Sequence, residues 1–238
     1  MGFGRISIDS REEWLEKRLG YQTASESAVI MGLSHFQSAT ELFDIKTGRT
    51  KARDISNLPS VRYGVAMEPL VREMALIENP YFRLEYHPYD ILTSEKYPYM
   101  SATLDGELYV TTDANPWGLK TGDMVVYEGK TGSFRSSRDL ERWRGRFGDE
   151  KIVPIEYWIQ VLHQLIVTEA RGALMGVRLH RDPYRDDDRG LPETLHFYRW
   201  IDADDPEVIE DMERIIEANI EWHSMLKDDR RPPMVLSI

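Results

Sequence analysis

The middle of the chain, residues 82–132, has a different hydrophobic period from the segments on either side. Short runs rich in Tyr, Val, Ile and Thr alternate there with Pro, Asn and Gly, which is typical of strands and turns. The flanking segments carry apolar residues at helical spacing. A chain of 238 residues can also bury a substantial core. We therefore expect a single domain over residues 1–238, of the α/β (α+β) class, with a central mixed β-sheet flanked by helices.

The predicted elements follow from this periodicity and from helix-capping and turn residues. Helices are expected over residues 10–20, 23–34, 37–48, 60–79, 154–170 and 205–226. Strands are expected within 82–94, 97–111, 123–131, 173–181 and 194–201. Connections are expected at 49–60, at 114–122, in a basic loop that runs to about residue 153, and in the turn-rich segment 182–192.

The absence of cysteine limits the chemistry available to the chain. Disulfides and thiolate-bound metals are excluded, so any metal must be held by carboxylates, carbonyls or imidazoles. No apolar run approaches the roughly 18 residues that a membrane span requires. The N-terminus lacks the basic start and apolar centre of a signal peptide. The simplest expectation is a cytoplasmic protein without a membrane partner.

The formal charge of −11 at first argues against a nucleic-acid partner, because phosphate binding favours lysine and arginine. The acidic residues are concentrated, however. Residues 202–230 hold eleven Asp or Glu and three Lys or Arg, whereas 130–148 hold six basic residues and two acidic ones. The net charge therefore does not exclude a locally basic channel.

Two carboxylates and a lysine stand near the ends of two neighbouring predicted strands. Glu128 and Lys130 share one face of their strand because side chains alternate, and Asp105 can lie beside Glu128 if the two strands pair. Such a hard-oxygen pair suits Mg²⁺ or Mn²⁺, and the lysine adds a cation able to orient or deprotonate water or to stabilise charge at phosphorus. Together these groups suit metal-assisted phosphodiester hydrolysis. The alternatives are a surface Glu–Lys pair and a plain Asp-Gly turn.

Five segments resemble those of the phage lambda exonuclease and YqaJ-type viral recombinase family, which belongs to the PD-(D/E)XK nuclease superfamily. They are "EKRLGYQTASESAVIMGLS" (16–34), "VRYGVAMEP" (61–69), "SATLDGE" (101–107), "VVYEGKTG" (125–132) and "YWIQVLHQL" (157–165), in the family's order. The resemblance implies a restriction-endonuclease-like catalytic core over about 11–170. The acidic C-terminal helix expected at 205–226 carries no segment that resembles the family.

The resemblance also implies a metal site. Asp105 and Glu128 resemble the metal-binding pair, with the main-chain carbonyl of Gly129 and the helix-borne Glu68 as further ligands. Lys130 resembles the catalytic lysine. The resemblance also implies that Gln160 is a catalytic residue. The expected cofactor is Mg²⁺, with Mn²⁺ possible and two ions in each active site; for Glu68 a solvated helix carboxylate is the alternative.

Arg18 and Ser25 resemble the pair that holds a terminal 5′-phosphate. A guanidinium grips phosphate bidentately, and a serine near a helix start adds a hydroxyl, although Ser25 could also be a plain N-cap. Tyr157, Gln160 and Gln164 share a helix face that could contact DNA backbone. Two further candidates for DNA-backbone contacts, Arg135 and Arg138, lie in the basic segment. The alternative for this segment is a solvated loop.

Three further residues are candidates for a role in the site. Asp113 and Asp123 could compete with Asp105 for a metal, but both have turn-like surroundings. His163 is better explained as a core or surface histidine than as a ligand. Two departures from the family pattern also stand out: Leu104 precedes Asp105 where proline is common, and residues 112–122 read as an inserted hairpin.

The leading functional hypothesis from the resemblance is a 5′→3′ deoxyribonuclease of the alkaline exonuclease type. It would digest one strand of linear duplex DNA from 5′-phosphorylated ends. The family implies a homotrimeric ring, a single-strand annealing protein as partner in recombination, and a phage or prophage origin in a bacterial host cytoplasm. The alternatives are another endonuclease of the superfamily and a non-catalytic DNA-end-binding protein on a nuclease fold.

Overall fold

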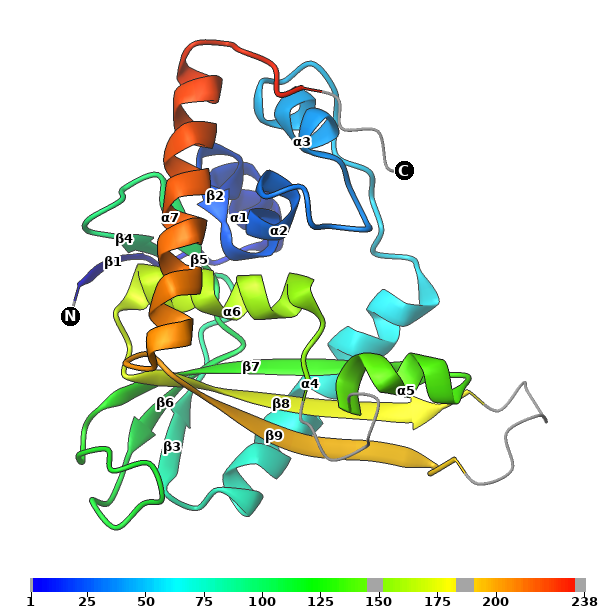
Figure 1. Ribbon diagram of the computed structural model, residues 1–238, viewed down its shortest axis with the longest axis vertical. Helices are drawn as coiled ribbons and strands as arrows, with labels where there is room; N and C mark the ends of the chain where they lie inside the picture. The colour runs from blue at the N-terminus through cyan, green and yellow to red at the C-terminus, as the bar shows by residue number, and fades with distance from the viewer. Residues whose placement is uncertain (1, 145–151, 183–190, 234–238) are drawn as a thin grey trace.

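Two mixed sheets form the framework of the protein (Figure 1). The computed structural model describes residues 2–144, 152–182 and 191–233. The larger sheet has the order β3-β6-β7-β8-β9, with β7 parallel to β8 and the other pairs antiparallel. Its strands are β3 Phe82–Glu85, β6 Gly106–Val110, β7 Met124–Phe134, β8 Gly172–Arg181 and β9 Thr194–Asp202.

The smaller sheet has the order β1-β4-β5-β2, and its β2 and β5 run parallel. Its strands are β1 Phe3–Ile6, β2 Gln22–Thr23, β4 Ile91–Ser94 and β5 Met100–Ala102. The α+β class is therefore confirmed, but the strands expected at 82–94 and 97–111 each divide between the two sheets. The first break contains Pro88, which cannot donate to a sheet ladder. The divided strands bring the two sheets together beside Asp105.

Apart from one helix at Ser137–Arg144, the described helices lie where the sequence predicts them, but several are shorter. They are α1 Arg11–Lys17, α2 Ser27–Ile30, α3 Ala39–Lys46, α4 Pro59–Glu78, α5 Ser137–Arg144, α6 Ile155–Thr168 and α7 Pro206–Lys227, with 3-10 turns at Arg18–Gly20 and Ala24–Glu26. The Ser10 hydroxyl accepts from the amide of Glu13 and begins α1. The helix predicted at 23–34 divides into the 3-10 turn and the short α2, and it ends before Gly32, whose φ is +71°. Glu169, with φ of 52°, ends α6 in place of the predicted Gly172.

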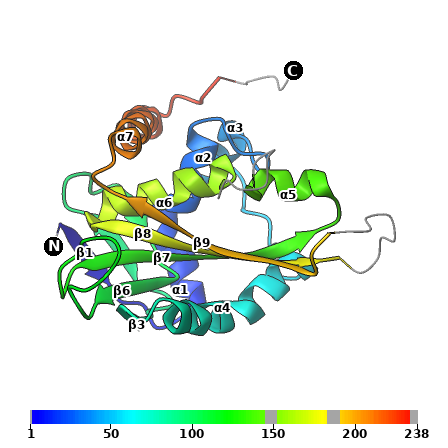
Figure 2. The same cartoon turned by 60° about the horizontal axis from the view of Figure 1, so that its bottom comes forward.

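The larger sheet is covered on both faces (Figure 2). Helix α4 lies on one face, and α5, α6 and α7 lie on the side of the other. The core divides in the same way along β7. Val125 and Tyr127 pack in the cluster that contains Ala75 of α4, whereas Val126 packs in the cluster that contains Leu162 of α6. This alternation sends Glu128 and Lys130 toward α6.

The prediction of a loop after Lys130 is wrong for most of the residues that the structure describes there. Strand β7 continues to Phe134, and α5 follows. Asp139 begins α5 by accepting hydrogen bonds from the amides of Arg135 and Ser136. Leu140 is buried and Trp143 stacks on Tyr157, with 5.5 Å between ring centroids. The many exposed arginines conceal this short amphipathic pattern in the sequence.

The connection between β6 and β7 is a loop of turns and bends, and both competing aspartates lie in it. Asp113 accepts from the amide and hydroxyl of Thr121, and Asp123 accepts from the amide of Lys120. Both aspartates therefore shape the turn at the opposite end of β6 from Asp105. In the described part of the chain, no helix is both long and apolar enough to cross a membrane. The end of the basic segment and most of the turn-rich segment 182–192 lie outside the described residues.

Candidate active site

Pairing of β6 with β7 brings Asp105 to the strand end that carries Glu128. The register joins Gly106 to Tyr127, and the amide of Gly129 donates to Asp105 Oδ2 at 2.9 Å. Asp105 sits in a bend just before β6, whereas Glu128 lies within the long central β7. The pairing expected from the sequence is therefore confirmed.

Glu128 is 1% exposed and accepts hydrogen bonds from three side chains. Lys130 Nζ lies 2.5 Å and Gln160 Nε2 lies 2.7 Å from Oε1, and Gln164 Nε2 lies 2.6 Å from Oε2. Gln160 Oε1 in turn accepts from Lys130 Nζ at 3.1 Å. The Lys130 ammonium also lies 4.7 Å from the ring centroid of Tyr157. The carboxylate is thus fixed by the neighbouring strand position and by α6.

These contacts indicate a role for each of the three residues that were predicted to share one face of α6. Gln164 is fully buried and donates to Glu128, so we assign it to orienting that carboxylate rather than to contacting DNA. Gln160 both donates to Glu128 and lines the open cleft described below. Tyr157 faces Lys130 on one side and Trp143 on the other. The shared face predicted for the three residues points mainly at β7.

The electrostatics of the site reflect two carboxylates held close together. Burial and the charge of Glu128 raise the pKa of Asp105 to about 7. Burial alone would lower the pKa of Lys130, but the carboxylates of Glu128 and Asp105 raise it above its ordinary value. Burial also raises the pKa of Glu68. One lysine thus offsets only part of the negative charge.

Glu68 approaches the site from α4, on the same cleft as Asp105. Its Oε2 lies 4.0 Å from Arg72 Nη1, and the same Arg72 nitrogen lies 3.5 Å from the main-chain oxygen of Asp105. The Arg72 guanidinium stacks on Tyr86 at 3.7 Å from the ring centroid. Arg72 therefore links Glu68 to Asp105. The sequence analysis missed it, although Arg72 stands one helical turn after Glu68.

The predicted phosphate-binding pair comes together where α1 ends and α2 begins. Arg18 Nη2 donates to Ser25 Oγ and to Thr23 Oγ1, each at 3.1 Å. The Arg18 guanidinium lies 4.5 Å from the ring centroid of Trp14, which stands one turn earlier on α1. Burial lowers the pKa of Arg18 from its usual value, although a guanidinium keeps its charge at neutral pH. The pocket therefore presents a fixed cation and two hydroxyls.

A buried lysine that the sequence analysis did not single out supports this pocket from behind. Lys46 of α3 donates to the main-chain oxygens of Arg18 and Tyr21 and pairs with Glu26 Oε2 at 2.8 Å. Glu26 Oε2 also accepts from the amide of Thr23. No local motif marks Lys46, because its partners lie 20 to 28 residues away.

One cleft of about 250 Å³ joins the two halves of the site. Arg18 and Ser25 line it together with Asp105, Glu68 and Gln160. Trp14, Thr23, Thr103 and Tyr86 also line it. Glu128 and Lys130 connect to the cleft through their hydrogen bonds to Gln160.

The remaining candidates lie away from the cleft lining. Arg135 is exposed and pairs with Asp182 at 2.8 Å, and Arg138 is exposed on α5. His163 is fully buried, and its Nδ1 lies 2.5 Å from Ser27 Oγ, as the core interpretation predicts. Burial lowers the pKa of His163 to about 3. His163 is thus a neutral interior group.

The chemistry of the strand-borne residues fits a hard divalent cation. Asp105 and Glu128 offer oxygen ligands, and their mutual repulsion, seen in the raised pKa of Asp105, would be relieved by a cation. The Gly129 carbonyl belongs to the same strand end. Among the described residues, no three acidic or histidine side chains converge as a metal site would require.

A comparison with known protein families shows which family this chain belongs to. The YqaJ-like viral recombinase domain matches residues 13–171, which is most of the chain. The chain belongs to this family. The matched segment contains Arg18, Ser25, Asp105, Glu128 and Lys130. Strand β1 and helix α7 lie outside it.

Solved structures show the same fold. The alkaline exonuclease LHK-Exo from Laribacter hongkongensis is similar with a TM-score of 0.57 and 20% identity, covering 92% of this chain and 96% of that one. Its complex with dAMP gives a TM-score of 0.55 and 19% identity over the same shares. No curated protein sequence matches the chain.

Proposed function

We propose that this protein is a metal-dependent 5′→3′ exonuclease that digests one strand of linear duplex DNA from 5′-phosphorylated ends. The observation that carries this proposal is the single cleft shared by the Arg18–Ser25 pair and Asp105. A pocket for a terminal phosphate beside a hydrolytic centre suits removal of nucleotides from an end. Membership of the recombinase family and the alkaline exonuclease fold are consistent with this activity.

The Arg18 pocket binds the terminal phosphate in this scheme. The guanidinium lies next to the Ser25 hydroxyl and donates to it, and Trp14 and Thr23 hold the guanidinium in place. A guanidinium recognises phosphate more strongly than it recognises a neutral hydroxyl. A 5′-phosphate should therefore bind more tightly than a 5′-hydroxyl end.

Asp105, Glu128 and the Gly129 carbonyl would hold Mg²⁺ or Mn²⁺, with Glu68 as a further ligand. The bound ion supplies Lewis-acid polarisation of the scissile phosphodiester and favours deprotonation of water. Lys130 donates hydrogen bonds from a charged ammonium and can stabilise negative charge at phosphorus. Gln160 and Gln164 orient the Glu128 carboxylate. A second ion in the same site is part of the proposal.

The wider biological setting is also part of the proposal. A homotrimeric ring and a single-strand annealing partner would place the protein in recombination of phage type. The acidic residues of α7 would then face outward, because the inward face of this helix is the one that buries Val208, Ile215 and Trp222. Native mass spectrometry of the purified chain tests the trimer directly.

The decisive experiment uses linear duplexes that differ only at their 5′ ends. A phosphorylated duplex in Mg²⁺ should release 5′-mononucleotides, and a hydroxyl-ended duplex should react at least about tenfold more slowly. Chelator should stop both reactions. Lys130→Ala should lower kcat by about a hundredfold or more, whereas the exposed Lys120→Ala control should not.

A covalently closed circular duplex separates this activity from its alternatives. An exonuclease that needs an end leaves the circle intact. Cleavage of the circle would instead favour an endonuclease. Binding to ends without metal-dependent hydrolysis would favour a non-catalytic end-binding protein.

A further inference from the structure

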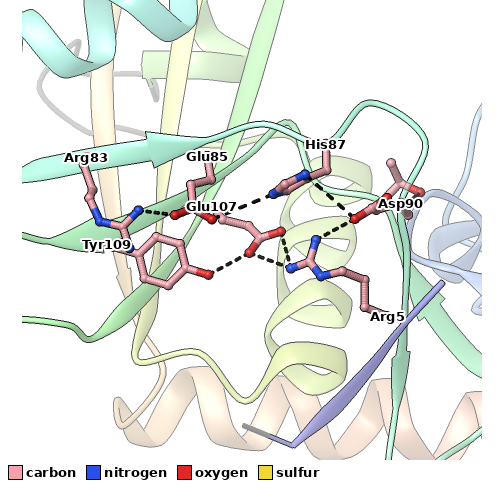
Figure 3. A network of polar contacts seen from close by, with 8 residues as sticks. Arg5, Arg83, Glu85, His87, Asp90, Glu107 and Tyr109 are labelled. Atoms are coloured by element: carbon pink, nitrogen blue, oxygen red, sulfur yellow. Dashed lines mark hydrogen bonds and ion pairs between the residues drawn. The ribbon is translucent and has the colours of Figure 1, made fainter. Parts of the chain in front are cut away.

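An ionic cluster with two buried carboxylates, Glu107 and Asp90, joins the two sheets beside the cleft (Figure 3). Arg5 of β1 donates through Nη2 to both oxygens of Glu107, at 2.7 and 2.8 Å, and through Nη1 to Asp90 Oδ2 at 2.7 Å. Glu107 belongs to β6 of the larger sheet, whereas Arg5 belongs to β1 of the smaller one. Arg5 thus bridges the sheets with a bidentate grip on one carboxylate and a bond to another.

The carboxylates in this cluster depend on Arg5 for their charge balance. The Glu107 side chain is 4% exposed and the Asp90 side chain is 11% exposed. Tyr109 also donates to Glu107 Oε2 at 2.9 Å, and His87 lies 3.9 Å from Asp90. A neutral tyrosine donor cannot balance a buried carboxylate as a guanidinium does. The cluster is therefore held mainly by Arg5.

One side of this cluster leads to the proposed metal ligands. Glu107 stands two residues after Asp105, where the chain enters β6. β6 pairs with β7, which carries Glu128, and the amide of Gly129 donates to Asp105. A shift of Glu107 would therefore move the chain that positions Asp105.

The other side leads to the terminal-phosphate pocket. The main-chain oxygen of Asp90 accepts from Thr103 Oγ1 at 2.9 Å, and Thr103 Oγ1 accepts from Trp14 Nε1 at 2.9 Å. The Trp14 ring makes a cation–π contact with the Arg18 guanidinium. Arg5 thus contacts, through its two carboxylate partners, both the Asp105 strand and the chain of contacts that supports Arg18. Its own position lies outside the family match, which begins at residue 13.

We propose that Arg5 is a positioning residue that sets the spacing between the terminal-phosphate pocket and the Asp105 strand end, and so the number of nucleotides released per cut. This inference rests on the proposed exonuclease function. The phosphate pocket and the hydrolytic centre act on the same strand, so their separation determines which phosphodiester is reached. A shift of about 1 Å in such a separation is enough to change reactivity strongly.

The test compares two Arg5 variants with a matched control. Arg5→Lys keeps the charge but cannot hold both carboxylates in the same fork geometry. The double variant Arg5→Met with Glu107→Gln removes both charges, so no buried carboxylate is left without its partner at position 107. Arg171→Met, which loses an exposed pair with Asp204, is the control.

Mass spectrometry of the nucleotides released from a 5′-phosphorylated duplex gives the product length. Wild type and Arg171→Met should release mononucleotides. Both Arg5 variants should release dinucleotides as at least about a tenth of the product, and their preference for phosphate over hydroxyl ends should fall about tenfold. Urea unfolding of each protein confirms that the comparison is made on folded chains.

Three outcomes would overturn the proposal. Folded variants that release mononucleotides only, with unchanged phosphate preference, would show that Arg5 does not set the spacing. A uniform loss of kcat on both ends without dinucleotides, or unfolding of both variants, would make Arg5 a stability residue. If wild type itself lacks phosphate- and metal-dependent release, the proposed function fails first, before any substitution is compared.

Discussion

The Gln164 side chain offers a direct test of how α6 holds the proposed metal-binding carboxylate. Gln164 is fully buried and donates to Glu128 Oε2 at 2.6 Å. Substituting Gln164→Leu removes this donor while keeping a side chain of similar size. Glu128, which is 1% exposed, then keeps Lys130 and Gln160 as its side-chain donors among the described residues.

Two opposing effects set the size of the change in stability. A hydrogen bond to a buried charged group contributes about 1.5–3 kcal/mol. Gln164 Oε1 is itself buried without a hydrogen-bond partner in the described part of the chain, so its removal returns about 1 kcal/mol. The loss of the donor is the larger effect. We expect the free energy of unfolding to fall by about 0.5–2 kcal/mol, which is a drop in Tm of roughly 1–8 °C for a chain of this size.

The same substitution should lower catalysis, because Glu128 becomes less firmly oriented. A fall in kcat of about tenfold, equivalent to about 1.4 kcal/mol, is expected on phosphorylated duplex in Mg²⁺. Urea unfolding and steady-state cleavage measure the two effects on one preparation. Gln37→Leu is the control, since Gln37 lies partly exposed in the loop before α3. A Gln164→Leu protein with wild-type stability and wild-type kcat would refute the assignment of Gln164 to Glu128.

Four further predictions test the site, the sheet and the charge distribution. Burial raises the pKa of Asp105 to about 7, so below this pH a Mg²⁺ ion must displace a proton from Asp105 in order to bind. The Mg²⁺ affinity measured by calorimetry should therefore fall about tenfold for each pH unit below 7 and should level off above pH 7. The same raised pKa favours the protonated folded state, so without metal this group's contribution to stability is present at low pH and declines as the pH rises from about 4 to about 7. Gly176→Ala would place Cβ 2.9 Å from the Tyr127 hydroxyl, which donates to the main chain of α4. Urea unfolding should therefore show a fall of about 1–3 kcal/mol in the free energy of unfolding. The control Gly20→Ala, which has open space around its Cβ, should not show this fall. Replacing exposed acidic residues of α7 by glutamine should change duplex affinity by less than about threefold in fluorescence anisotropy at fixed salt, and a tenfold change would contradict an outward-facing helix. The substitutions are at Glu213, Glu217 and Glu221.

The elements that sequence periodicity predicted well are those whose signals are local. Ser10 caps α1, and the long apolar run before Glu128 forms β7. Helix α5 escaped prediction because only Leu140 and Trp143 mark its inward face among many charged residues. The division of the strands between two sheets also escaped prediction, because it depends on which strands pair across long sequence separations.

The sequence by itself determined which side chains share a strand face. Alternation along β7 requires Glu128 and Lys130 to point the same way, and the apolar residues between Met124 and Tyr127 require that strand to be buried. Asp105 was placed beside them by the single assumption that neighbouring strands pair. These results follow from covalent geometry and local periodicity alone.

Only the tertiary structure decided how distant groups meet. It joined Arg18 to Asp105 in one cleft, assigned Gln164 to Glu128 and tied Arg5 to Glu107, 102 residues away. Such contacts leave no periodic signal, because each depends on the relative position of whole sheets and helices. The physical reason is that a buried carboxylate needs donors from whichever element packs against it, and packing is a property of the folded chain.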